Sequence, residues 1–164
     1  MEQVILMCGL AGSGKSTVAR RLERDGYVLL SFDEEAWRRG HRDHPVSPAD
    51  ASRVHEHLQG ELAKIVASGA RAVVDTSFWS RASRDDYRRL LAPLGVVPAV
   101  YHVVVPRDVL LSRLEARSGA GPNDIVVSAE SLQAYADGFQ DPTSAEGPVR
   151  VVSGVSGAQV ESDV

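Results

Sequence analysis

The chain has 164 residues, of which 43% are hydrophobic and 24% are charged, and its formal net charge is −4. This length fits a single domain over residues 1–164, and no apolar run approaches the roughly 18 residues of a membrane span. The acidic balance argues against a broad basic surface that would hold long nucleic acid.

The chain begins with a predicted strand over residues 4–8. The preceding residues 1–3 lack the basic start of a signal peptide, so we expect a cytoplasmic protein. Cys8 is the only cysteine and lies within this strand, which favours a small buried side chain over a reactive thiol and excludes an internal disulfide.

A glycine-rich loop follows this strand directly. Gly9, Gly14, Lys15 and Ser16 occupy the fixed positions of the pattern G-x-x-x-x-G-K-[ST], which binds phosphates where a strand leads into a helix. Glycines let the backbone N–H groups converge on phosphate oxygens, while the lysine reaches the β- and γ-phosphates and the hydroxyl ligates Mg²⁺. The loop therefore predicts binding of ATP and Mg²⁺, with nucleotide contacts from Gly9, Leu10, Ala11, Gly12, Ser13, Gly14, Lys15, Ser16 and Thr17.

The next two predicted elements bring an acidic residue to the same place. A helix is expected from about Lys15 to Arg24, and the apolar run 27–32 then predicts a buried strand that ends at Asp33. In an open α/β sheet, ligands bind at the carboxyl ends of the strands. Asp33 is therefore the candidate general base for an acceptor hydroxyl, and capping of the following helix is the structural alternative.

A second acidic residue follows the third predicted strand. Residues 38–49 are polar and contain glycine and proline, which indicates a loop or a short helical excursion over the active edge. Ser47 is the expected N-cap of a helix that continues to about residue 68. The strand 71–75 then ends at Asp75, which has the form of a Walker B acid that holds Mg²⁺ through water, with capping again the alternative.

The rest of the chain continues to alternate helices and strands. The expected elements are a helix over 80–91, a strand over 98–105, a helix over 106–114, a helix over 128–139 and a strand over 149–152. The charged face of the helix 80–91, which includes Arg84, is expected to turn outward. This alternation predicts a three-layer α/β fold with a five-stranded parallel sheet covered by helices on both faces. Residues 154–164 are rich in serine and glycine and are expected to form a frayed tail.

Residues 113–128 are predicted to form a lid, because the glycine-rich break at 118–122 interrupts the helical pattern. Arg113 and Arg117 are four residues apart, so on one helix they would project from the same face toward ATP. Either arginine would clamp the γ-phosphate or stack on adenine, and a solvated helix face is the alternative. Arg117 is expected to matter most for turnover, and an Arg117→Ala enzyme with unchanged phosphoryl transfer would remove it from the site.

Several side chains are expected near the acceptor. Aromatic residues beside the two acidic residues would stack on a base or sugar face, or would fill a core under the lid. The histidines at positions 41, 44, 55 and 57 lack the spacing of a zinc site, so they are expected at the surface or facing the acceptor. The expected acceptor contacts are Asp33, Trp37, Arg38, Asp75, Thr76, Phe78 and Trp79.

The order of these motifs resembles that of the small P-loop kinases. The closest branch is an AAA-type ATP-binding family that includes the kinase domain of bacteriophage polynucleotide 5′-kinase and relatives of zeta toxin. The resemblance covers residues 3–152, and the glycine-rich loop is its most specific motif. The other similar motifs are Ser31-Phe32-Asp33, Val74-Asp75-Thr76-Ser77, Arg113-x-x-x-Arg117 and Asp141-Pro142-Thr143-x-x-Glu146-Gly147.

The resemblance implies a sheet order of 2-3-1-4-5 and specific roles for three side chains. In polynucleotide kinases the residue matching Asp33 is the general base, the one matching Asp75 precedes a threonine in the active site, and the one matching Arg117 covers the transferred phosphate. The chain departs from the family pattern at two positions, of which the first counts against a nucleic-acid acceptor. Ala36 stands where this branch usually has an arginine, and Ser77 stands where it often has an asparagine.

We therefore expect an ATP- and Mg²⁺-dependent kinase that phosphorylates a hydroxyl of a small molecule, such as a nucleoside, sugar or aminocyclitol. Lys15, Asp33 and Arg117 are its expected catalytic residues. One alternative is a polynucleotide 5′-hydroxyl kinase, and another is a nucleotide-binding regulatory ATPase module. The lid arginines and Asp33 argue against a regulatory module, because a switch needs no base beside an acceptor. No membrane partner is expected.

Overall fold

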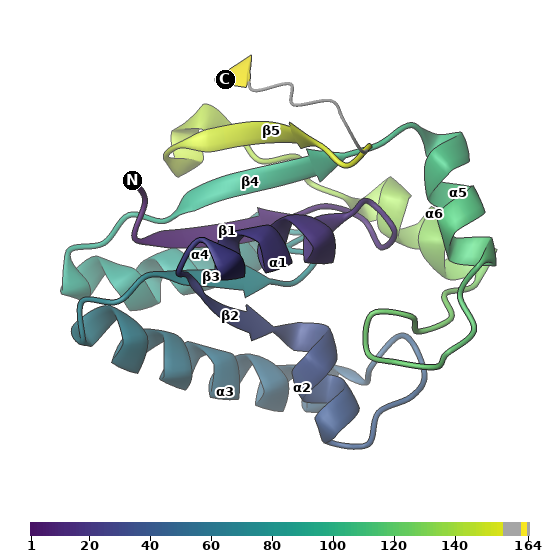
Figure 1. Cartoon of the computed structure of the whole chain (residues 1–164), viewed down its shortest axis with the longest axis horizontal. Helices are drawn as coiled ribbons and strands as arrows, with labels where there is room; N and C mark the ends of the chain where they lie inside the picture. The colour runs from purple at the N-terminus through teal and green to yellow at the C-terminus, as the bar shows by residue number, and fades with distance from the viewer. Residues whose placement is uncertain (156–161, 164) are drawn as a thin grey trace.

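A six-stranded sheet forms the middle layer of the protein (Figure 1). The structure is a computed structural model that describes residues 1–155 and 162–163. Five strands are parallel and follow the order β2-β3-β1-β4-β5, which confirms the predicted fold class and strand order. These strands are β1 (Val4–Cys8), β2 (Val28–Ser31), β3 (Ala72–Asp75), β4 (Ala99–Val104) and β5 (Val149–Ser153).

The sixth strand, β6 (Ser162–Asp163), pairs antiparallel with β5 through Arg150 and Val151. The prediction of a frayed tail was therefore wrong for these two residues. A strand of two residues is too short to show an alternating hydrophobic pattern in the sequence. Residues 156–161 and 164 lie outside the described part of the chain, so the frayed tail stays a prediction there.

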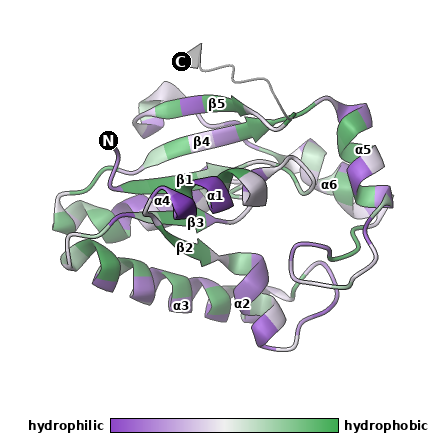
Figure 2. Ribbon diagram, in the orientation of Figure 1, coloured by the Kyte–Doolittle hydropathy of each residue, from purple (hydrophilic) through white to green (hydrophobic). Residues whose placement is uncertain are grey.

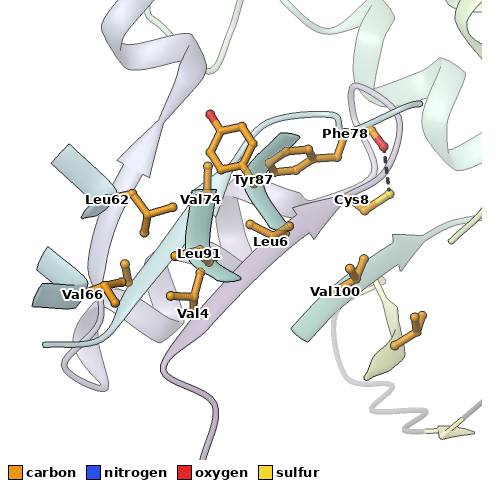
Figure 3. Close-up of a cluster of buried hydrophobic side chains, with 12 residues drawn as sticks. Val4, Leu6, Cys8, Leu62, Val66, Val74, Phe78, Tyr87, Leu91 and Val100 are labelled. Carbon is orange, nitrogen blue, oxygen red and sulfur yellow. Dashed lines mark hydrogen bonds between the residues drawn. The ribbon is translucent and has the colours of Figure 1, made fainter. Parts of the chain in front are cut away.

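Helices cover both faces of the sheet (Figure 1). Alternate residues of a strand point to opposite faces. Ile5 and Met7 of β1 pack on α1, while Leu6 and Cys8 pack on the opposite face (Figure 3). Figure 2 shows β1 hydrophobic along its length, as expected for a strand buried on both faces. The helices are α1 (Lys15–Arg24), α2 (Phe32–Arg38), α3 (Pro48–Ala67), α4 (Arg81–Leu91), α5 (Arg107–Glu115) and α6 (Ala129–Gly138), with 3₁₀ turns η1 (Ala92–Leu94) and η2 (Ser144–Glu146).

The segment after β2 is a helix, where the sequence predicts the end of a strand and then a loop. Strand β2 ends at Ser31, whose hydroxyl oxygen accepts a hydrogen bond of 3.2 Å from the backbone N–H of Glu34. Ser31 is therefore the N-cap of α2, and the acidic residues of the first turn complement the positive end of the helix dipole. Asp33 lies in this first turn and is not the cap.

Arg84 departs from the predicted outward charged face of α4, because its side chain is completely buried. Its Nε and Nη2 donate to the carboxylate oxygens of Glu146 at 2.7 and 3.0 Å, and its Nη1 donates to the carbonyl of Phe78 at 2.6 Å. Tyr87 and Leu91, three and seven residues later, pack in the core. The prediction was wrong because this helical spacing turns Arg84 inward.

Glu146 lies in η2, within the motif 141–147, and gathers several donors. Besides Arg84, the Arg88 guanidinium donates to its carboxylate at 2.6 Å, and the backbone N–H of Thr143 donates at 3.2 Å. Burial would raise the pKa of Glu146, but the hydrogen bonds from Arg84 and Arg88 outweigh burial and lower this pKa to about 2. The motif therefore fixes α4 and the loop after β3 to the segment that precedes β5.

Across the part of the chain that the structure describes, no helix combines the length and the apolar character needed to cross a membrane.

Candidate active site

A cavity of about 830 Å³ lies at the carboxyl ends of β1 and β3. This volume falls within the range of about 300–1,000 Å³ that is typical of small-molecule sites. Its walls come from the glycine-rich loop, the first turn of α2, the loop before α3, the loop after β3, the segment 113–128 and α6. Figure 1 shows these segments gathered at the end of the sheet toward which the parallel strands point.

The glycine-rich loop has the shape of a phosphate cradle. Gly12 and Gly14 have φ angles of 82° and 100°, which residues with a Cβ rarely adopt. A Cβ on Gly14 would lie only 3.2 Å from the carbonyl oxygen of Gly154, so the end of β5 packs closely against the loop. Because α1 begins at Lys15, the positive end of its dipole lies at the cavity. The loop therefore fits a polyphosphate chain.

Lys15, Ser16 and Asp75 lie together at the base of the cavity. The Ser16 hydroxyl donates to the Asp75 carboxylate at 2.9 Å, and Lys15 Nζ donates to the Leu10 carbonyl at 3.0 Å. Burial lowers the pKa of Lys15, and the charge of Asp75 opposes this shift. A hydroxyl beside a carboxylate suits a hard cation, so Ser16 and Asp75 fit the predicted Mg²⁺, directly and through water respectively.

Asp33 opens onto the same cavity from the first turn of α2. Its side chain is accessible from the cavity, although protein surrounds it closely. Burial raises the pKa of Asp33 to about 6, and the Asp75 carboxylate adds to the rise, while Lys15 and Arg117 oppose it. A carboxyl group with this pKa is ionised at neutral pH and is more basic than an ordinary aspartate, which suits a general base.

The raised pKa of Asp33 predicts a pH dependence. Only the ionised carboxylate can accept a proton, so kcat/KM for phosphoryl transfer should rise with pH and level off above the pKa of about 6. Below this pKa the rate should fall about tenfold per pH unit. Nucleotide affinity measured at each pH is the control. A flat profile between pH 4.5 and 8 would show that Asp33 is not the base.

The two lid arginines do not project from one helix face as predicted, because α5 ends at Glu115 and Arg117 lies beyond it. Arg113 donates to the carbonyl oxygens of Gly12 at 3.1 Å and Gly154 at 2.8 Å. This arginine therefore joins the glycine-rich loop to the chain after β5, although it also lines the cavity.

Arg117 takes a different place from Arg113. It lines the cavity, donates to the Ile125 carbonyl at 3.1 Å and lies near enough to Asp33 for their charges to interact. The guanidinium is thus on the side of the cavity where phosphate and acceptor would meet.

The segment between α5 and α6 is organised by Asp124. Its carboxylate accepts hydrogen bonds from the backbone N–H groups of Ser118 at 3.1 Å and Ala120 at 3.2 Å, and from the Ser118 hydroxyl at 2.7 Å. The neighbouring Asn123 lines the cavity and lies 3.4 Å from the Ser16 hydroxyl. Sequence reasoning missed Asn123, because a loop position carries no periodic signal.

Trp37 and Arg38 do not line the cavity, in contrast to their predicted contact with the acceptor. The Trp37 ring stacks on the Arg42 guanidinium, 3.7 Å from the ring centroid, and Arg38 pairs with a glutamate of its own helix. Successive residues of a helix turn by about 100°. Arg38 therefore lies on the side of α2 away from Asp33 and Ala36, which line the cavity, whereas Trp37 lies one turn beyond Asp33 and contacts Arg42 instead.

Thr76, Phe78 and Trp79 lie in the cavity wall. Phe78 is only 1% exposed and packs edge-on against Tyr87, with ring centroids 4.9 Å apart, so it belongs to the core beneath the wall. Trp79 remains 41% exposed. Its side chain is therefore available to a bound molecule.

Four further residues with aromatic or imidazole rings line the cavity, and these are Phe32, His44, His55 and Tyr135. His44 and His55, expected at the surface or facing the acceptor, both line the cavity. Tyr135 of α6 packs against His44 with ring centroids 5.3 Å apart. The position of Tyr135 could not be predicted, because nothing local in the sequence indicates how α6 is placed over the sheet.

The AAA domain family matches residues 4–142, which include the glycine-rich loop, both acidic residues and the segment 113–128. The chain belongs to this AAA domain family. The match confirms the resemblance to the small P-loop kinases.

Relatives of this AAA domain protein include a UPF0200 protein of Pyrobaculum aerophilum, 36% identical over 122 residues, covering 71% of this chain and 67% of that protein. The fold is similar to a putative kinase from Chloroflexus aurantiacus, with 22% identity, 93% and 88% coverage and a TM-score of 0.75. It is also similar to a sugar kinase from a Janibacter species, with 19% identity, 94% and 86% coverage and a TM-score of 0.68.

A third solved structure, the Pnkp1/Rnl/Hen1 RNA repair complex, has a chain with 20% identity and a TM-score of 0.64. The match covers 85% of this AAA domain protein but only 46% of that chain. These solved structures establish the shared kinase fold.

Proposed function

We propose that this AAA domain protein is an ATP-dependent kinase that transfers the γ-phosphoryl group to a hydroxyl of a small molecule. The supporting observation is that Asp33 opens onto the cavity that also contains Lys15, Ser16 and Asp75. A carboxylate that faces a phosphate cradle and has a pKa of about 6 is placed to receive a proton from an acceptor.

In the proposed reaction the acceptor oxygen attacks the γ-phosphorus while its proton passes to the carboxylate of Asp33. The bond between the γ-phosphorus and the bridging oxygen breaks, and ADP leaves with the electron pair. Lys15 and the N–H groups of the glycine-rich loop bind the phosphate oxygens, and Arg117 stabilises the charge on the transferred group. Mg²⁺ bound at Ser16 and Asp75 would neutralise phosphate charge.

A polynucleotide 5′-hydroxyl acceptor has less support. Ala36 lies in the cavity wall where the polynucleotide kinases usually have an arginine, so this position provides no cation for a nucleic-acid phosphate. The net charge of −4 also offers no broad attraction to a polyanion.

The function can be tested with γ-labelled ATP, Mg²⁺ and a fractionated mixture of small metabolites. We expect slow ATP hydrolysis alone and a stable phosphorylated product when an acceptor is present. If ADP forms at the same rate with and without every fraction, and no phosphorylated product appears, the protein is a nucleotide-hydrolysing module and not a kinase.

A further inference from the structure

Many side chains with an aromatic or imidazole ring line the cavity on the walls away from the glycine-rich loop. Only 5% of the chain is Phe, Trp or Tyr, yet two of its three phenylalanines and one of its two tryptophans line this cavity. The ring-bearing residues of these walls are Phe32, His44, His55, Phe78, Trp79 and Tyr135.

Apart from Arg117, these walls provide no positive charge. The cationic residues that line the cavity are Lys15, Arg113 and Arg117, and each donates to a backbone carbonyl of the glycine-rich loop, the segment 113–128 or the end of β5. Burial lowers the pKa of His44 and of His55, so both imidazoles are neutral at pH 7. Residues 156–161 and 164, which lie outside the described part of the chain, contain no lysine or arginine.

The nearest basic side chains are engaged elsewhere. Arg38 and Arg39 pair with Glu35, and Arg42 stacks on Trp37. None of these side chains lines the cavity, whose acceptor walls instead carry the carboxylates of Asp33 and Asp43. An anionic acceptor would therefore meet like charge from both carboxylates, while Arg117, the arginine near Asp33, is assigned to the transferred phosphate.

The wall between α2 and α3 is apolar and has few hydrogen-bonding groups, whereas Thr76, Ser77, Ser83 and Asn123 bring polar groups to other parts of the lining. Ala36, Pro45, Val46, Pro48 and Ala51 form the wall between α2 and α3. A polyol that loses water here would leave hydroxyl groups unsatisfied, at a cost of about 1–3 kcal/mol for each group. An aromatic ring of a ligand would bind favourably to the same wall, because the ring buries apolar surface there and packs against the edges of the aromatic side chains.

We propose that the acceptor is an uncharged alcohol that carries an aromatic ring, with the ring held against Trp79 and the neighbouring rings and the hydroxyl directed to Asp33. This inference rests on the proposed kinase function and narrows its acceptor class. It predicts that phosphorylated acceptors, nucleic-acid ends and simple sugars are poorer substrates than an uncharged aromatic alcohol.

A matched set of acceptors tests the proposal by phosphoryl transfer from γ-labelled ATP. Adenosine, uridine and 2-phenylethanol are uncharged ring alcohols, methyl β-D-ribofuranoside lacks the aromatic ring, and adenosine 3′-monophosphate adds a charged phosphate. We expect at least one ring alcohol to exceed both comparison compounds by about tenfold or more in kcat/KM. Equal or better use of the ribofuranoside or the phosphorylated nucleoside would overturn the proposal. If Mg·ATP binds but none of these compounds or metabolite fractions is phosphorylated, the proposed kinase function itself fails.

Tryptophan fluorescence gives a second readout that does not depend on turnover. The chain has only Trp37 and Trp79, and Trp79 is the one that lines the cavity. With Mg²⁺ and a saturating non-hydrolysable ATP analogue, uridine should change the emission of the Trp37→Phe variant, whose remaining tryptophan is Trp79. The Trp79→Phe variant is the matched control and should not respond. A response from both variants, or from neither, would contradict placement of the ring beside Trp79.

Discussion

Replacing Asp33 with asparagine is expected to lower phosphoryl transfer by about 10²–10⁴-fold without weakening the affinity for Mg·ATP. Asparagine keeps the size of the side chain but cannot accept the acceptor proton. The rate of labelled product formation gives the first quantity, and calorimetric titration with a non-hydrolysable analogue gives the second. Glu34→Gln is the matched control, because Glu34 is the next residue of the same helix, pairs with Arg20 and does not line the cavity.

The same substitution should not reduce stability at neutral pH. The pKa of Asp33 is about 6 in the folded protein, above its ordinary value of 3.8, so the folded state binds this proton more tightly than the unfolded chain. Ionisation of Asp33 therefore disfavours folding increasingly as pH rises from about 4 to 6. Asp33→Asn should have an equal or higher Tm at pH 7.5. Lost transfer together with a lowered Tm would indicate a structural role, and unchanged transfer would remove Asp33 as the base.

Replacing Glu146 with alanine is expected to reduce the free energy of unfolding by about 3–5 kcal/mol, because it leaves the buried guanidinium of Arg84 without a counter-charge. This loss is a large part of the 5–15 kcal/mol that is typical of a folded domain. Chemical denaturation followed by circular dichroism measures it. The control is Asp85→Ala, which removes a more exposed partner of Arg88 and should cost less than about 1 kcal/mol.

The ion pair of Arg84 and Glu146 also predicts how the free energy of unfolding depends on pH. The pKa of Glu146 is about 2 in the folded protein and about 4.3 in an unfolded chain, so its contribution is complete above pH 5 and is lost as pH falls toward 2. The wild-type protein should therefore lose stability more steeply than Glu146→Ala over this range. Parallel pH curves for the two proteins, or a loss below 1 kcal/mol at pH 7, would show that Arg84 finds another partner.

Local signals account for the parts of the fold that the sequence predicts well. The glycine-rich loop is fixed by its own residues, and helix starts at Ser47 and Ser128 carry a hydroxyl that accepts from the backbone N–H three residues later. The same signal, Ser31 followed by Glu34, marks the start of α2, but the apolar run through Phe32 favoured a longer strand. The incorrect placement of Trp37 and Arg38 follows from missing this helix.

Contacts between distant segments explain what the sequence does not predict. Arg84 and Glu146 are 62 residues apart, and no local pattern shows that the two charges are buried together. The cavity positions of Asn123 and Tyr135 depend on how the segment 113–128 and α6 lie over the sheet. In contrast, Lys15, Asp33 and Asp75 could be predicted together, because the carboxyl ends of parallel strands share one edge.

Calorimetric titration of the wild-type protein and Lys15→Met with a non-hydrolysable ATP analogue tests most directly whether the glycine-rich loop binds a nucleotide. Lys15 is the cation of the cradle, and a hydrogen bond to a charged group contributes about 1.5–3 kcal/mol. We predict saturable, Mg²⁺-dependent binding by the wild-type protein and an affinity at least about tenfold lower for Lys15→Met, with no loss of Tm. Absence of binding to the folded wild-type protein, or equal affinity in the two proteins, would contradict the phosphate cradle and the kinase built on it.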